Sequence, residues 1–66
     1  MQITVNGEAR TLDAGVSVAD LVRLFNLTPQ RVAVEVNEQL VRRATYADTP
    51  LNDGDRVEIV TLVGGG

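Results

Sequence analysis

The spacing of the apolar residues changes twice along the chain, and this change constrains the fold more than any other feature of the sequence. Apolar and polar residues alternate over residues 2–5, as in a strand with one buried face. Apolar residues then recur at intervals of three and four, which is the spacing of one helical face: Val18, Leu21, Val22 and Phe25, with Leu24 widening it. Alternation returns in the second half. Because 66 residues allow one small domain, we predict a single helix packed on a sheet.

Turn and cap residues set the boundaries of the first segments. Asn6-Gly7 supplies the two positive-φ residues of a tight turn, so residues 2–12 are predicted to form a β-hairpin. Ser17 is a favourable N-cap for the helix, and Asp20 completes a weak capping box. Asn26 is predicted as the C-cap.

The second half of the chain predicts three further strands. They are residues 31–37, 40–43 and 56–63, joined by a turn at Glu38-Gln39, an irregular segment 44–50 and a turn at 51–55. One helix that must cover one sheet face gives a two-layer α+β domain. With the first and last strands parallel at the centre of a mixed five-stranded sheet, this is the β-grasp arrangement. We expect it to span residues 1–63.

The composition excludes most catalytic chemistry. The chain has no Cys, His or Lys, so it has no disulfide, no zinc site, no Cys–His or Ser–His nucleophile and no Schiff-base amine. We therefore predict no enzyme activity, no catalytic residue, no metal and no cofactor. Six Arg against nine acids give a net charge of −3, which disfavours nucleic acid and favours a partner with a positive groove. No stretch approaches the length of a membrane span, and no signal peptide is evident. The expected location is the cytoplasm.

Three glycines follow directly on the last apolar strand: Gly64, Gly65 and Gly66. Such a tail adds nothing to a core and costs much conformational entropy to order. One interpretation is a frayed terminus or a cloning remnant. The other is a flexible tail that threads a narrow channel and presents its carboxylate for reaction. A carboxylate is an anion at pH 7 and a poor electrophile, so another protein must activate it, most simply as an acyl-adenylate made from ATP.

The last strand also breaks the rule for a half-exposed sheet. If Val57 and Ile59 face the helix, alternation places Glu58, Val60 and Leu62 on the opposite face. Exposed apolar residues beside a functional terminus predict a partner-docking surface. The alternative is that a neighbouring loop covers them.

The acidic residues give weaker signals. Asp53-Gly54-Asp55 lacks the spaced oxygen ligands of a calcium loop, and we interpret it as a turn. Glu35 and Glu58 are expected opposite each other on adjacent strands, on a solvated face rather than in a catalytic cleft.

Four segments of the chain resemble the ThiS family, the sulfur carriers of thiamine biosynthesis. They are residues 1–7 (MQITVNG), 32–37 (VAVEVN), 51–60 (LNDGDRVEIV) and 63–66 (VGGG), and their order and spacing cover the whole chain. The resemblance implies a ubiquitin-like β-grasp fold. It also implies that an adenylating enzyme of the ubiquitin-activating type converts Gly66 to an acyl-adenylate. Sulfur from a cysteine-desulfurase persulfide or a related donor would then yield a thiocarboxylate, and thiazole synthase would take that sulfur.

Three alternatives stay open at this point. The small subunit of molybdopterin synthase is a sulfur carrier of the same class, although such chains are usually longer and often carry prolines before their Gly-Gly end. A protein modifier would be attached to its targets through Gly66. A plain β-grasp interaction module would leave the glycine tail unexplained.

Overall fold

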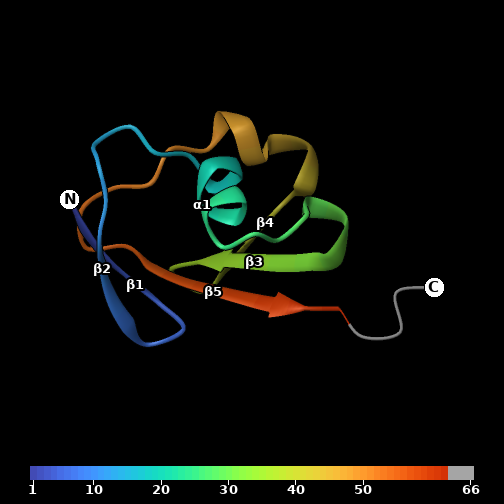
Figure 1. Cartoon of the computed structure of the whole chain (residues 1–66), viewed down its shortest axis with the longest axis horizontal. Coiled ribbons are helices and arrows are strands. Elements are labelled where there is room, and N and C mark those ends of the chain that lie inside the picture. Colours follow the sequence, from blue (N-terminus) through green and yellow to red (C-terminus); the bar gives the residue numbers. More distant parts are fainter. Residues whose placement is uncertain (63–66) are drawn as a thin grey trace.

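Five strands form one mixed sheet in the computed structural model, which describes residues 1–62 (Figure 1). The strands are β1 (Gln2–Val5), β2 (Glu8–Thr11), β3 (Val32–Val36), β4 (Gln39–Val41) and β5 (Arg56–Thr61). Their order across the sheet is β2-β1-β5-β3-β4. Strands β1 and β5 lie parallel at the centre, and the other neighbouring pairs are antiparallel. The predicted α+β architecture, a mixed five-stranded sheet with one main helix, is confirmed.

The first hairpin forms as predicted. Asn6 and Gly7 have φ values of 51° and 83°, which is the left-handed backbone that a two-residue turn between β1 and β2 requires. Val5 pairs with Glu8 across that turn and with Val57 on the parallel side. The turn therefore fixes the register of the hairpin that borders β5.

The helix α1 (Val18–Leu24) begins at the predicted cap. The Ser17 hydroxyl accepts the Asp20 N–H at 3.1 Å, and the Asp20 carboxylate accepts the Ser17 N–H at 3.0 Å. Two details differ from prediction. The C-cap is Phe25, and Asn26 occupies the following left-handed position with φ 58°. Leu24 does not widen the buried face: it is 59% exposed, because it lies on the solvent side of the last turn.

The described part of the chain also contains two 3₁₀ helices, η1 (Pro29–Arg31) and η2 (Arg43–Asp48). The segment predicted to be irregular is therefore largely helical, and the predicted strand at 40–43 is displaced. Its turn is formed by Asn37 and Glu38, both with positive φ, so the strand starts one residue earlier. It ends before Arg43, whose Nε donates to the Pro29 carbonyl at 2.7 Å.

The core lies between the sheet and α1, with η2 beside the helix. In Figure 1 both α1 and η2 lie on the same side of the sheet. Buried residues from the strands, α1, η2 and the 51–55 turn meet there: Ile3, Val5, Val18, Leu21, Val22, Val32, Val34, Tyr46, Leu51, Val57 and Ile59. Within residues 1–62, no element covers the opposite face (Figure 1). That open face carries the candidate site.

Candidate functional site: the open face of the sheet

The outward residues of β5 lie on the open face. Val57 and Ile59 are buried in the core as predicted, whereas Glu58, Val60 and Leu62 are exposed. Val60 is 58% exposed and Leu62 is 44% exposed, so within residues 1–62 the alternative of a covering loop is wrong. The predicted alternation is confirmed, and the docking role of these residues stays a prediction.

Two further apolar residues extend this surface. Ala33 lies opposite Val60 in the register of β3 and β5, and Leu40 lies opposite Glu35 in the register of β3 and β4. Leu40 is 68% exposed. Ala33, Leu40 and Leu62 line one depression of about 200 Å³. We call Ala33, Leu40, Val60 and Leu62 the apolar patch. Exposed apolar patches of this kind mark interaction surfaces.

Sequence reasoning did not include Leu40 or Ala33 in this surface. Alternation along β3 places Ala33 on the same face as Glu35, and this pattern could have identified Ala33 as part of the surface. The face of Leu40 depends on its pairing with β3, and that pairing follows from the turn at Asn37 and Glu38. With the turn placed one residue too late, the outward side of this short strand could not be identified.

Backbone and side-chain hydrogen bonds fix both ends of β5. At its start, the Arg56 N–H donates to Asn37 Oδ1 at 2.9 Å. Beyond its end, the Leu62 N–H donates to the Arg31 carbonyl at 2.7 Å. The last described residue of the chain is thus tied to the domain. The predicted tail residues Gly64, Gly65 and Gly66, and the predicted domain boundary at Val63, lie outside the described residues.

The aspartates of the 51–55 turn have structural roles. Asp53 Oδ1 accepts the Gln2 N–H at 2.6 Å, which joins the turn to β1. The Asp55 carboxylate accepts the Asn52 N–H at 2.8 Å and Asn37 Nδ2 at 2.9 Å. These bonds confirm the interpretation of this segment as a turn.

Glu35 and Glu58 lie directly opposite each other on β3 and β5, as predicted, and both are exposed. Among residues 1–62, no group of three or more Asp or Glu is arranged to hold a metal ion. The helices of this part of the chain are all too short to cross a membrane.

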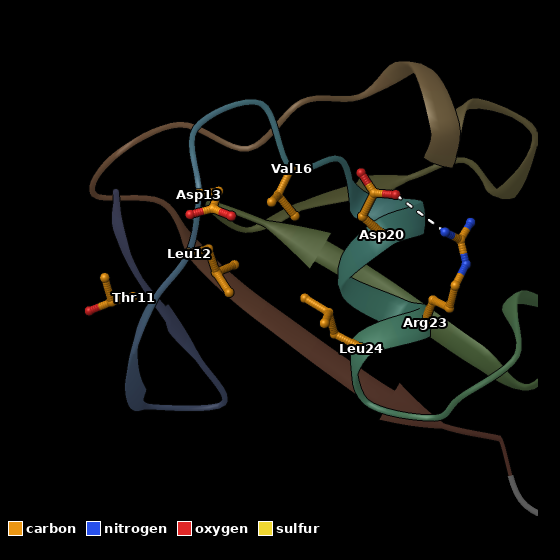
Figure 2. A pocket seen from close by; sticks show the side chains of 7 residues that line it. All are labelled: Thr11, Leu12, Asp13, Val16, Asp20, Arg23 and Leu24. Carbon is orange, nitrogen blue, oxygen red and sulfur yellow. Dashed lines mark ion pairs between the residues drawn. The ribbon is translucent and has the colours of Figure 1, made fainter.

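Another depression, of about 460 Å³, lies between α1 and the segment that precedes it (Figure 2). Leu12 and Leu24 supply apolar surface, and Asp20 and Arg23 form an ion pair of 3.6 Å at its edge. Hydrogen bonds with Ser17 lower the pKa of Asp20. The bond with the Ser17 backbone has the largest effect, and the bond with its side chain has the next largest. Asp20 is therefore an ionised capping residue and not a general acid.

Comparison with known proteins decides the family. The ThiS family matches residues 3–66, and a crystal structure of the thiamine biosynthesis protein ThiS from Geobacter metallireducens superimposes with a TM-score of 0.84. The two chains are 33% identical, and the match covers 100% of each. This chain belongs to the ThiS family.

The ThiS relatives include two carriers of similar length. Sulfur carrier protein ThiS of Thermus thermophilus is 36% identical over 64 residues, covering 97% of this chain and 98% of that protein. Sulfur carrier protein ThiS of Escherichia coli is 30% identical over 66 residues, covering 100% of both. The predicted membership of ThiS is confirmed, and with it the β-grasp fold and the prediction of a carrier rather than an enzyme.

The chain also matches part of longer proteins. It is 39% identical over 66 residues to thiazole synthase of Paramagnetospirillum magneticum. The match covers 100% of this chain and 20% of that protein, so the chain spans about a fifth of the length of that relative. In that thiazole synthase, a ThiS-like segment is part of the same polypeptide.

Proposed function

We propose that this chain carries sulfur for thiamine biosynthesis as a thiocarboxylate on Gly66. One observation carries the proposal: in a ThiS-family chain, the exposed apolar residues Val60 and Leu62 lie a few residues before the Gly64-Gly65-Gly66 sequence. A docking surface beside a tail without side chains suits a protein whose carboxylate reacts in the active site of another. The chain itself contains no Cys, His or Lys to serve as a nucleophile.

The proposed chemistry begins with activation of the carboxylate. An oxygen of the Gly66 carboxylate attacks the α-phosphorus of ATP, and pyrophosphate leaves. The terminal sulfur of a persulfide then attacks the activated carbonyl, and AMP leaves. A thiol reduces the resulting acyl disulfide and releases the thiocarboxylate. Other proteins supply every catalytic group, and this chain supplies the acyl carbon and the surface by which it is held.

The proposed partners follow from these steps. An adenylating enzyme of the ubiquitin-activating type would catalyse the first, and a cysteine desulfurase or related donor would supply the sulfur. Thiazole synthase would receive it; the match to part of a thiazole synthase chain supports this pairing. The proposed setting is the cytoplasm, and Glu58, Val60 and Leu62 are the proposed docking residues, extended by Ala33 and Leu40.

Exchange of radioactive pyrophosphate into ATP tests the first step. The adenylating enzyme with the full chain should catalyse exchange, because acyl-adenylate formation is reversible. A chain that lacks Gly65 and Gly66 should not support it, although its described domain is unchanged. Exchange at an undiminished rate with the shortened chain would contradict the proposal.

A further inference from the structure

The open face carries an uncompensated pair of negative charges at one end. Glu35 and Glu58 are opposite each other across β3 and β5. They line a depression of about 290 Å³ together with Glu38 and Arg56. Arg56 contacts Glu38 at 3.3 Å. Within residues 1–62, Glu35 and Glu58 have no ion-pair partner.

The same face carries a positive charge beside the apolar patch, on the side of β4. Val34 pairs with Val41, so continuing this register by one residue places Arg42 beside Ala33. Arg42 lines the depression that Leu40 and Leu62 also line. It is exposed and forms no ion pair with any residue of 1–62. The open face is therefore negative where Glu35 faces Glu58, and positive at Arg42, which lies on the β4 side of Ala33 and Val60.

The arrangement of the two glutamates does not stabilise the isolated domain. Like charges directly opposite on neighbouring strands are destabilising, whereas opposite charges at the same positions contribute favourably. A local rule broken in an otherwise consistent fold is expected at a functional site. A cation supplied from outside would turn this repulsion into attraction. The pair thus fits a partner that carries a basic group.

We propose that the open face docks onto a protein surface with a basic group against Glu35 and Glu58, apolar residues against the apolar patch and an acidic group against Arg42. This inference rests on the proposed function, for which the adenylating enzyme is the partner. The opposite orientation would bring like charges together, which disfavours it. The positions of these opposite charges therefore fix how the open face is oriented on the partner.

Charge-removing variants of the full chain test this inference. They are the double variant Glu35→Gln/Glu58→Gln, the single variant Arg42→Gln, and Asp48→Asn as a control that removes one negative charge at the end of η2. Binding to the purified adenylating enzyme is measured at about 0.01 M and about 1 M salt, where the screening length is about 30 Å and about 3 Å. Thermal unfolding of each variant is measured in parallel.

The double variant should bind roughly tenfold or more weakly at low salt, with a smaller salt dependence than the wild type. Its melting temperature should rise, because the repulsion between the glutamates is removed. Arg42→Gln should also bind more weakly, and Asp48→Asn should bind as the wild type does. Wild-type affinity of the double variant at both salt concentrations would overturn the inference. An equal loss in Asp48→Asn would also overturn it, since net charge alone would then account for binding.

Sulfur loading with a saturating amount of enzyme separates this inference from the proposed function. A wild-type chain that acquires no sulfur contradicts the proposed function and the docking inference together. A wild-type chain that is loaded, while the double variant binds with unchanged affinity, contradicts the docking inference alone. A double variant that binds weakly but is loaded fully at saturation supports both.

Discussion

The side chain of Asn6 forms two hydrogen bonds with the backbone of Ile59. Asn6 Nδ2 donates to the Ile59 carbonyl at 3.1 Å, and Asn6 Oδ1 accepts the Ile59 N–H at 2.8 Å. The amide thus continues the pairing of β1 and β5 beyond Val5 and Val57, where the backbone of the hairpin turns away. A turn residue near the start of the chain holds the strand that carries Val60.

Replacing Asn6 with Gly should destabilise the domain by about 1–3 kcal/mol, since two hydrogen bonds of about 0.5–1.5 kcal/mol each are lost. Gly tolerates the φ of 51°, so the backbone is not strained. Asn26→Gly is the matched control, because Asn26 has a φ of 58° and makes no side-chain hydrogen bond within residues 1–62. Urea unfolding measures both. An equal effect of the two substitutions would show that the bonds to Ile59 contribute nothing.

Replacing Val60 and Leu62 together with Glu should abolish tight binding to the adenylating enzyme or to thiazole synthase. Each apolar anchor at an interface centre contributes about 2 kcal/mol or more, so the double change costs about a thousandfold in affinity, at about 1.4 kcal/mol per tenfold. Isothermal titration calorimetry measures the loss. Leu24→Glu is the control: it changes an exposed leucine on the helix and should leave affinity unchanged.

The inward residues of β5 give the converse test. Val57→Glu should unfold the domain, because Val57 is 1% exposed and an unpaired carboxylate would be buried in the core. The Val60/Leu62 variant should stay folded by circular dichroism, since exposed substitutions shift stability by about 0.5 kcal/mol or less. A folded Val57→Glu protein beside an unfolded Val60/Leu62 variant would contradict the register of β5.

The helix cap predicts a pH dependence of stability. Hydrogen bonds with Ser17 lower the pKa of Asp20 below its ordinary value of 3.8, and the bond with the Ser17 backbone has a larger effect than the bond with its side chain. A lowered pKa in the folded state means that ionised Asp20 stabilises the fold above the unfolded-state pKa. This contribution disappears as the pH falls through the folded-state pKa. The stability difference between wild type and Asp20→Asn should therefore be present at neutral pH and vanish in acid. A difference that stays the same in acid would contradict this prediction.

Gly65→Val should impair adenylation while the fold is unchanged. A β-branched side chain restricts the backbone and widens a segment that is proposed to enter a narrow channel. The core residues all lie between Ile3 and Ile59, so the melting temperature should hardly change. Pyrophosphate exchange measures the first effect and calorimetry the second. Adenylation at the wild-type rate would argue against a narrow channel.

The features that the sequence predicts correctly are those that local residues determine. Asn6-Gly7 defines its turn, Ser17 and Asp20 cap the helix within one turn, and alternation assigns the two faces of β5. The turn at Asn37 and Glu38, which the sequence predicts one residue too late, depends on contacts between residues far apart in the sequence. Asn37 adopts its φ of 52° while its side chain bonds Asp55 and the Arg56 backbone, 18 and 19 residues away.

The candidate site likewise has features that local residues determine and features that depend on contacts distant in the sequence. Val60 and Leu62 could be identified from alternation, because neighbours in one strand decide their face. The contribution of Leu40 and the polarity between Glu58 and Arg42 depend on the order of β5, β3 and β4 across the sheet. That order is a tertiary property, and no pattern within one strand contains it.

Intact-mass analysis tests the central claim most directly. The full chain is incubated with ATP, the adenylating enzyme and sodium sulfide, whose sulfur displaces AMP without a reductant. The account predicts a mass increase equal to the replacement of one oxygen by one sulfur, located on Gly66 by fragmentation and absent without ATP. Sulfur found on any other residue, or on a chain that lacks Gly65 and Gly66, would contradict it.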